Sequence, residues 1–318
     1  MTRASLSHDP LWPRAGDWPA PVLREGDSAS DLHVARGNDI DVALVGIPAS
    51  HTSLSPTNAH LTPAAIRDAL RRYSPALMPS PWQDITDLTQ LTYADFGDVD
   101  DPDSVAGEAR TQELVGRASA RSQLVIALGG DNSVTVATAL GAWGSELSTA
   151  GLITLDAHYD LREGVSNGSP VRRLIEAGLD PRRIVQVGIQ DFANSAAYAR
   201  RALELGITVI HRDELESRSM ADVMAQALHL AGSAGGPIHV DFDVDVCDRS
   251  VVPACPAALP GGISAYQLRE AARLAAMDPR VRSLDITEID ASADSADGRT
   301  IRLAALCVLE AAAGVNAR

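Results

Sequence analysis

The sequence predicts an α/β protein built on a mainly parallel β-sheet that helices cover on both faces. The first observation behind this prediction is the regular alternation of short apolar runs with longer amphipathic, alanine-rich stretches. The second is that the apolar runs are continuous, which is typical of strands buried on both sides. The third is the length of 318 residues, which is enough to bury a sizeable core without disulfides.

The predicted strands are seven runs rich in valine, leucine and isoleucine. Three of them continue into polar, mostly acidic residues at their carboxyl ends. The runs cover residues 42–47, 124–130, 151–158, 183–189, 207–210, 238–246 and 281–290. Their continuous apolar character is the reason to expect parallel rather than antiparallel pairing.

Amphipathic patterns between and after these runs predict helices. The clearest ones cover residues 63–74, 197–206, 221–232, 265–277 and 299–314. No low-complexity linker or repeat interrupts the pattern, so we predict a single domain over residues 41–318. Residues 1–40 are polar and interrupted by prolines, and we predict that they form an N-terminal arm, which carries Trp12 and Trp18.

The composition excludes several classes of function. A formal net charge of −15 repels nucleic-acid phosphates, and no helix carries a stripe of arginines. No window approaches the roughly 18 apolar residues of a membrane span, and the N-terminus lacks the apolar core of a secretory signal. Cys247, Cys255 and Cys307 show no paired spacing, which indicates free thiols in a reducing cytosol. We therefore expect a soluble, cytoplasmic protein that binds a small molecule, not nucleic acid or a membrane.

Three predicted strands end in polar sequences, namely LGGDNS, LDAHYD and VDFDVDVCD. In open α/β sheets, ligands bind beyond the carboxyl ends of the strands, where the connecting loops converge. Asp156, His158 and Asp160 are spaced two residues apart in the second of these segments. If the strand is still extended there, their side chains share one face and can converge on one ion.

The third segment carries a second cluster of carboxylates at Asp241, Asp243, Asp245 and Asp248. Such closely spaced carboxylates would repel one another unless a cation neutralised them. A single Asp-x-Asp motif is usually a solvated turn or a helix cap, but two clusters that each follow an apolar strand favour a metal site. Carboxylates with one imidazole favour Mn²⁺, while zinc and nickel stay open on ligand type alone. Two ions about 3.5 Å apart would activate a shared water, so the predicted reaction is hydrolysis.

From these motifs the chain resembles the arginase/agmatinase/formimidoylglutamase family of ureohydrolases, and within it most resembles the formimidoylglutamases. The resemblance extends from about Val42 to the C-terminal helix. It implies a three-layer αβα sandwich, two Mn²⁺ ions, trimers or hexamers, and cleavage of a carbon–nitrogen bond in a guanidino or formimino group. Besides the two acidic clusters, it includes PAAIR at Pro63, FGDV at Phe96, GGDNS at Gly129, VGI at Val187, PGG at Pro260 and LDITEID around Glu288.

The resemblance also implies a role for each acidic residue. It assigns Asp156, Asp160 and Asp243 to the first manganese, with Asp156 and Asp243 bridging the two ions. It assigns His158 and Asp245 to the second.

Glu288 matches a glutamate that contacts the cationic group of the substrate, and a carboxylate suits that task as a counter-charge. The alternative for Glu288 is a buried ion pair. Glu288 and Asp160 are the predicted catalytic residues, and Asp160 is a candidate proton donor to the leaving group.

The chain departs from the family pattern at Asn132, where most members have a histidine ligand. An amide oxygen binds metal more weakly than imidazole does, so the first site is expected to be weak or vacant. Asp131 beside it is expected to support the site rather than to bind the metal.

The loop SNGSPVRR places Asn167 where the arginase-like branch has a histidine proton shuttle, and the loop itself resembles that of formimidoylglutamases. By the same resemblance, Asn167 and Arg162 are predicted to bind the substrate. Arg162 is suited to a substrate carboxylate as a planar, bidentate donor. Its alternative role is an ordinary structural or surface ion pair.

The leading functional hypothesis is hydrolysis of N-formimidoyl-L-glutamate to L-glutamate and formamide, a step of histidine degradation. One alternative keeps the fold and changes the substrate to another guanidino acid or amine, as in agmatinases or guanidinobutyrases. Another is a metal-poor, non-catalytic paralogue that binds a ligand, which Asn132 suggests. The retention of so many mutually repelling carboxylates argues against that last possibility.

Overall fold

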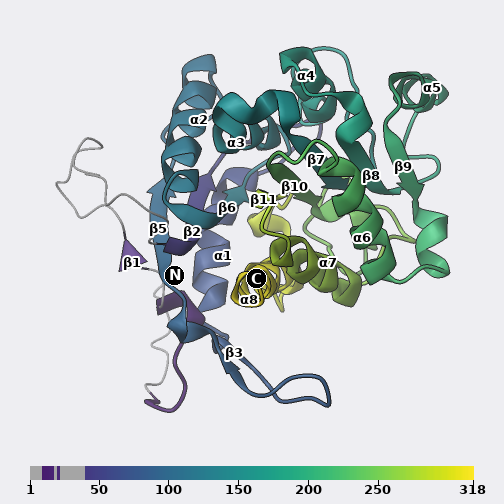
Figure 1. Cartoon of the computed structure of the whole chain (residues 1–318). Coiled ribbons are helices and arrows are strands. Elements are labelled where there is room, and N and C mark those ends of the chain that lie inside the picture. Colours follow the sequence, from purple (N-terminus) through teal and green to yellow (C-terminus); the bar gives the residue numbers. More distant parts are fainter. Residues whose placement is uncertain (1–8, 18–19, 22–39) are drawn as a thin grey trace.

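The computed structural model describes residues 9–17, 20–21 and 40–318, and these form a three-layer αβα sandwich (Figure 1). Its centre is a nine-stranded sheet with the order β1-β5-β2-β6-β11-β10-β7-β8-β9, in which every pairing is parallel. The strands are β1 (Ala20–Pro21), β2 (Ile40–Ile47), β5 (Tyr93–Asp98), β6 (Ser122–Gly129), β7 (Gly151–Leu155), β8 (Ile184–Ile189), β9 (Thr208–His211), β10 (Ile238–Asp243) and β11 (Val281–Thr287). A separate antiparallel pair is formed by β3 (Ala76–Leu77) and β4 (Thr86–Asp87). The predicted fold class is confirmed.

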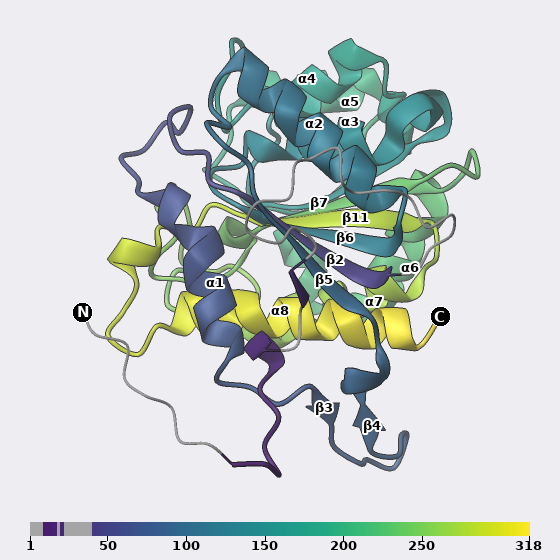
Figure 2. The same cartoon turned by 90° about the vertical axis from the view of Figure 1, so that its left-hand side faces the viewer.

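Helices cover both faces of the sheet (Figure 2). One layer contains α2 (Val105–Ser119), α3 (Val134–Trp143), α4 (Pro170–Ala177) and α5 (Ala196–Leu205). The other contains α1 (Thr62–Leu70), α6 (Met220–Ala231), α7 (Ala265–Met277) and α8 (Arg299–Asn316). Every residue of β7, β8 and β10 is buried between these layers. Burial on both faces explains the apolar sequence of β7, whereas β10 also buries His239, Asp241 and Asp243. No helix in the described part of the chain is long and apolar enough to cross a membrane.

Serine side chains start several of the helices. Ser104, Ser195, Ser219 and Ser264 precede α2, α5, α6 and α7, and each accepts a backbone N–H from the first turn of its helix. These bonds satisfy donors that have no partner inside the helix and therefore fix where each helix begins.

The seven predicted strands and five predicted helices are all present, but the pattern missed other elements. Strand β5, which contains the FGDV motif, carries Asp95 and Asp98, and both pair with Arg67 of α1 at 2.7 and 2.6 Å. These polar residues interrupt the apolar run on which the strand prediction depended. Helices α2, α3 and α4 were also not among the predicted ones.

The predicted strands 151–158, 238–246 and 281–290 are too long at their carboxyl ends. In the structure, β7 ends at Leu155, β10 at Asp243 and β11 at Thr287. Asp245 lies in a 3₁₀ turn over Val244–Val246. The acidic residues beyond these points are therefore positioned by loops rather than by the two-residue repeat of an extended strand.

Candidate metal centre

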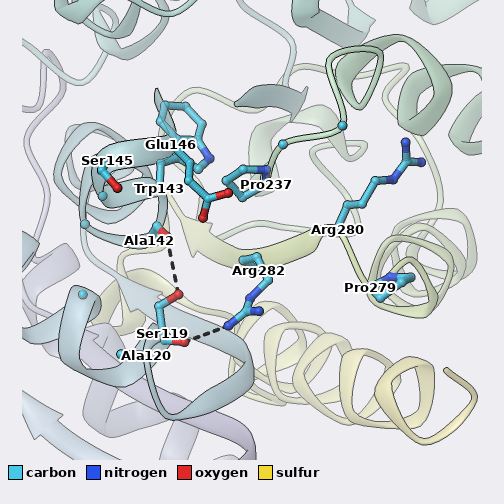
Figure 3. Close-up of a pocket in the computed structure, with 15 residues that line it drawn as sticks. Ser119, Ala120, Ala142, Trp143, Ser145, Glu146, Pro237, Pro279, Arg280 and Arg282 are labelled. Atoms are coloured by element: carbon cyan, nitrogen blue, oxygen red, sulfur yellow. Dashed lines mark hydrogen bonds between the residues drawn. The ribbon is translucent and has the colours of Figure 1, made fainter. Parts of the chain in front are cut away.

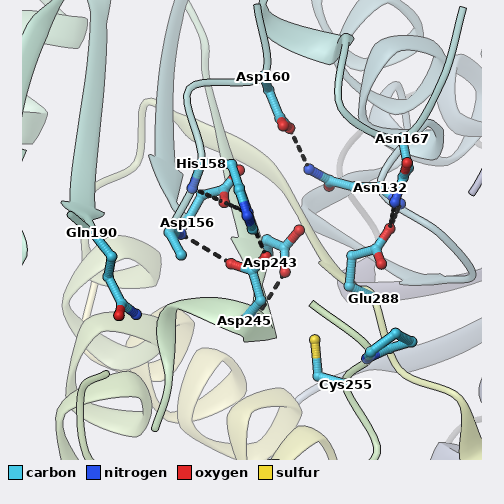
Figure 4. Close-up of polar contacts among 12 residues, drawn as sticks. Asn132, Asp156, His158, Asp160, Asn167, Gln190, Asp243, Asp245, Cys255 and Glu288 are labelled. Atoms are coloured by element: carbon cyan, nitrogen blue, oxygen red, sulfur yellow. Dashed lines mark hydrogen bonds and ion pairs between the residues drawn. The ribbon is translucent and has the colours of Figure 1, made fainter. Parts of the chain in front are cut away.

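The predicted site residues meet at the carboxyl ends of four adjacent strands, β6, β11, β10 and β7 (Figure 4). Asp156 follows β7 directly, Asp243 is the last residue of β10, and Glu288 follows β11. Asn132 lies in the turn between β6 and α3. Because all strands of the sheet are parallel, their carboxyl ends share one edge, and residues distant in the sequence become neighbours there.

One group of ligand atoms is formed by Asp156, His158 and Asp245, whose candidate donor atoms lie within 4.8 Å of one another. His158 Nδ1 lies 2.7 Å from Asp245 Oδ2 and 3.4 Å from Asp156 Oδ1. Asp245 also accepts the Ala157 N–H at 2.9 Å through its other oxygen, which fixes the carboxylate. These residues were assigned to the second metal by resemblance, and the fold brings them together.

A second group consists of Asp156, Asp160 and Asp241, whose oxygen atoms also lie within 4.8 Å of one another. The sequence placed Asp241 in the acidic cluster that predicted a metal site, but the resemblance assigned it no ligand role. Asp243, which the resemblance assigned as a bridging ligand, is buried beside them and accepts the Asp245 N–H at 2.8 Å. Its ligand role stays a prediction.

Burial governs the electrostatics of the cluster. Burial, together with the negative charge of the neighbouring Asp245, raises the pKa of Asp156 to about 7. Burial and adjacent carboxylates likewise hold the pKa values of Asp160 and Asp243 well above the ordinary range. Although burial alone would lower the pKa of His158, Asp245 and Asp156 raise it to about 12. Burial is the largest cause of the raised carboxylate pKa values and neighbouring negative charges add to it, so a bound cation would favour the ionised forms.

Asn132 presents its amide nitrogen, not its oxygen, to the carboxylates. The nitrogen donates to Asp160 Oδ2 at 2.7 Å. The oxygen accepts hydroxyl hydrogen bonds from Thr135 at 3.0 Å and Thr287 at 2.9 Å. The predicted ligand role of Asn132 stays a prediction, and in this arrangement it would require the amide to turn over and break three hydrogen bonds.

Glu288 is buried and has no cationic partner among the described residues. The structure therefore does not show the buried ion pair that was the alternative role for this residue. Its Oε1 accepts the Asn132 N–H and the Asn167 side-chain amide, both at 2.8 Å. Burial raises its pKa to about 7, although the bond from Asn167 lowers it. Glu288 and Asp160 both have positive φ angles, 62° and 51°, which are unfavourable for residues other than glycine and are often found at functional sites.

A pocket of about 710 Å³ opens above this cluster. Its lining contains most of the predicted site residues: His158, Asp160, Arg162, Asn167, Asp243, Asp245 and Glu288. Arg201 also lines the pocket, but it pairs with Glu163 at 2.6 Å. No hydrogen bond or ion pair of the Arg162 guanidinium is found within the described part of the chain. The guanidinium of Arg162 is therefore available to a ligand. It does not form the structural ion pair that was the alternative role for this residue.

The backbone of the DAHYD segment is held by polar residues from the neighbouring strand and loop. Asn194 accepts the Tyr159 N–H at 3.0 Å and donates to the Ala157 carbonyl at 2.8 Å. Asp131, expected to support the site, accepts hydrogen bonds from Ser133 and Thr52. Asp248 lies apart from the cluster, because it accepts the Ser250 and Gly261 N–H groups in the following loop.

Another pocket, of about 560 Å³, lies at the opposite edge of the sheet (Figure 3). It is lined by residues that precede or begin β10 and β11, including Pro237, Arg280 and Arg282. Arg282 is committed to the carbonyl groups of Ser119 and Ser122 at 2.8 and 2.9 Å. This pocket contains none of the acidic residues of the strand ends, so the candidate centre is the pocket at the carboxyl edge.

Comparison with known proteins identifies the family. The formimidoylglutamase of Bacillus subtilis is 32% identical over 314 residues, covering 93% of this chain and 97% of that protein. That of Halalkalibacterium halodurans is 33% identical, covering 88% and 92%. The crystal structure of the B. subtilis formimidoylglutamase superposes with a TM-score of 0.85 at 28% identity, covering 99% of this chain and 95% of that one. A Trypanosoma cruzi formiminoglutamase crystallised with Mn²⁺ has the same fold, with a TM-score of 0.79 at 22% identity and coverage of 90% and 97%. The model of the arginase family matches residues 40–314, and the chain belongs to this family.

Proposed function

We propose that this protein is a manganese-dependent formimidoylglutamase that hydrolyses N-formimidoyl-L-glutamate to L-glutamate and formamide. The observation that carries this proposal is the charge distribution of the main pocket. The pocket of about 710 Å³ is lined both by the buried carboxylate of Glu288 and by the guanidinium of Arg162, which has no ion pair or hydrogen bond within the described residues. A substrate with an amidine cation at one end and carboxylates at the other complements both. Relatives at 32% and 33% identity over most of the chain carry this name.

The residues present fit a manganese site. Asp156 Oδ2 is buried with no hydrogen-bond partner in the described chain, and the donor set is carboxylate oxygens with one imidazole nitrogen. Asp156, His158 and Asp245 would hold one ion, and Asp156, Asp160 and Asp243 are the residues proposed for the other. Bound manganese supplies a nucleophilic water at neutral pH, which hydrolysis of an amidine requires.

The protein's own side chains position the substrate. Glu288 is held by Asn132 and Asn167, so its carboxylate is fixed before a substrate arrives. We propose that it binds the protonated formimino group and orients its carbon toward the carboxylate cluster. Asn167 is in turn fixed by the Leu54 N–H at 3.1 Å, which connects the substrate loop to the turn after β2. Asp160 faces the same pocket and is the proposed donor of a proton to the departing glutamate nitrogen.

Arg162 is the residue that we propose selects an acid over an amine. A guanidinium binds a carboxylate through two parallel hydrogen bonds, whereas agmatine has no carboxylate to offer. Gly168 makes room for this side chain, since a Cβ there would lie 2.7 Å from Arg162 Cδ. A guanidino acid hydrolase is the second candidate function, because Arg162 would also suit such a substrate and a guanidinopropionase of Pseudomonas aeruginosa is 29% identical over 294 residues.

The proposal also covers the metabolic pathway, the cellular compartment and the oligomeric state of the enzyme. Formimidoylglutamate arises in the breakdown of histidine, so we propose that the chain acts in that degradation, in the cytoplasm. We also propose a homo-oligomer, trimeric or hexameric, on the resemblance to the family. Neither the pocket nor the cluster described above depends on these two points.

One set of assays tests the function. Purified protein is loaded with Mn²⁺, its metal content is measured, and formamide release from formimidoylglutamate is followed. Arginine, agmatine, guanidinobutyrate and guanidinopropionate are assayed in parallel for urea release. We expect formimidoylglutamate to be the best substrate. Preference for a guanidino acid would support the second candidate, and absence of both metal and turnover would refute both.

A further inference from the structure

Asp241 is a buried carboxylate that the proposed mechanism does not use. It lies on β10 two residues before Asp243, and its strand neighbours are Thr154 on β7 and Asp285 on β11. Its side chain is fully buried, with 0% exposure. Neither of its oxygens has a hydrogen-bond partner within the described part of the chain. An ionised carboxylate that is buried without a hydrogen-bond donor or counter-charge is unfavourable, so Asp241 either carries a proton or has a cation as its partner.

The geometry indicates where that partner lies. One oxygen of Asp241 is within 4.8 Å of oxygens of both Asp156 and Asp160. Asp156 belongs also to the group with His158 and Asp245, so it is common to two converging sets of ligand atoms. Its Oδ2 is buried and has no partner either within the described residues. Two sets that share one carboxylate are the arrangement expected of two neighbouring ions with a bridging ligand.

The group of Asp156, Asp160 and Asp241 receives no metal-ligand atom from Asn132, although the family resemblance implied a ligand at that position. Asn132 directs its amide nitrogen at Asp160, while Thr135 and Thr287 hold its oxygen. A carboxylate is also a better ligand for Mn²⁺ than an amide oxygen is. Asp241 lies within reach of the same two carboxylates, and its position two residues before Asp243 places both side chains on one face of β10.

We propose that Asp241 is a ligand of the first manganese ion and supplies the metal-binding oxygen that Asn132 does not. This inference rests on the proposed metal-dependent function and adds a ligand to it. The first ion is then held by Asp156, Asp160 and Asp241, with Asp243 nearby, and it need not be weak. Asn132 instead orients Asp160 by its hydrogen bond, which makes it a positioning residue.

The competing explanation is that Asp241 shares a proton with Asp285 and has no contact with metal. Asp285 is also fully buried, and its Oδ2 lies 3.1 Å from His239 Nε2, whereas its Oδ1 has no hydrogen-bond partner among the described residues. His239 is fixed by Ser283 at 2.8 Å through its other nitrogen. Asp285 thus has a partner for one of its oxygens, and it serves as the matched control because it is buried in the same row of the sheet but belongs to neither group of ligand atoms.

The test compares Asp241→Asn with Asp285→Asn in the full-length protein. Manganese binding is measured by equilibrium dialysis with elemental analysis, and coupling between two ions by electron paramagnetic resonance. We expect the wild type and Asp285→Asn to bind two ions per chain. In Asp241→Asn the affinity of one of the two should fall at least about tenfold, with loss of the coupled signal. Two ions bound by Asp241→Asn as tightly as by the wild type would overturn the proposal.

Two further measurements keep the result interpretable. Without metal, Asp241→Asn should be at least as thermostable as the wild type, because a repelling buried charge has been removed, and added Mn²⁺ should raise its Tm less. If this variant does not fold, Asp241→Ser is used under the same criteria. Formamide release is assayed separately. If the wild type binds two ions, Asp241→Asn loses one of them, and the wild type does not release formamide, only the proposed substrate is refuted. If the wild type releases formamide but Asp241→Asn binds both ions as tightly as the wild type does, only this inference is refuted.

Discussion

Arg162 and Glu288 place side chains of opposite charge in the lining of one pocket. Glu288 is buried and receives two hydrogen bonds, so it is fixed as a counter-charge for a cation. Arg162 is exposed to the pocket and is not engaged by the residues that the structure describes. The identity of both residues was predicted from the sequence, but their states of pairing depend on contacts with loops far away in the chain.

Removing the guanidinium of Arg162 should weaken substrate binding. For Arg162→Ala we expect KM for formimidoylglutamate to rise about 10–100-fold, equivalent to about 1.5–3 kcal/mol for hydrogen bonds to a charged group, with kcat changed much less. Steady-state kinetics measure this split. Arg200→Ala is the control, since Arg200 is exposed and does not line the pocket. An equal fall in kcat for Arg162→Ala would indicate a structural role instead.

Position 132 offers a second test at this scale. For Asn132→His we expect tighter binding of manganese at the first site, because an imidazole nitrogen is a stronger ligand than an amide. The change also removes the side-chain hydrogen bonds of Asn132 to Asp160, Thr135 and Thr287, so a modest loss of stability should accompany it. Titration with Mn²⁺ measures the affinity. Unchanged affinity would mean that residue 132 does not face that ion.

At the scale of elements, strand ends decide the geometry of the site. The sequence pattern located the strands, but it extended β7 and β10 over the acidic residues that follow them. In the structure β7 ends at Leu155, and Asp160 reaches the cluster through a backbone with φ of 51°. Local periodicity cannot place such a residue, because a left-handed conformation at a non-glycine residue is imposed by the surrounding contacts.

Helices α7 and α8 are joined by a buried charge network that permits a prediction of stability. Glu310 on α8 accepts hydrogen bonds from Arg269 at 2.6 Å and Arg273 at 2.6 Å, and only 6% of it is exposed. Glu310→Gln should lower the free energy of unfolding by about 1–3 kcal/mol, because two arginines lose a shared counter-charge. Thermal or urea unfolding gives the change. Glu270→Gln on α7, whose carboxylate has no ion pair within the described chain, should differ little from the wild type, and an equal effect there would contradict this explanation.

For the molecule as a whole, we propose that residues 41–318 form one domain and residues 1–40 an arm. Strand β2 begins at Ile40, next to the boundary that we propose. Of the arm, the described residues 9–17 contact the end of α1, where Arg14 Nη1 donates to the Arg71 carbonyl at 2.9 Å. Trp12 is half-exposed there, whereas Trp18 lies outside the described residues.

Deleting the arm tests this division. A chain beginning at Asn38 should fold cooperatively and bind manganese as the full-length protein does, because no site residue lies in the arm. Its Tm should fall by a few degrees, since the contacts with α1 and the pairing of β1 with β5 are lost. Circular dichroism and metal analysis provide the measurements. Loss of cooperative unfolding would show that the arm is part of the domain.

The sequence by itself determined the α/β class, the parallel sheet, the family and the identity of the acidic residues at the strand ends. These properties follow from hydrophobic periodicity and from short motifs, which are local. Tertiary structure decided which way the amide of Asn132 faces, that Glu288 has no cationic partner in the described chain, and that Asp241 approaches Asp156 and Asp160. Each of these depends on side chains that meet only when the carboxyl ends of separate strands are brought to one edge. Contacts between residues so far apart in the sequence leave no periodic signal in it.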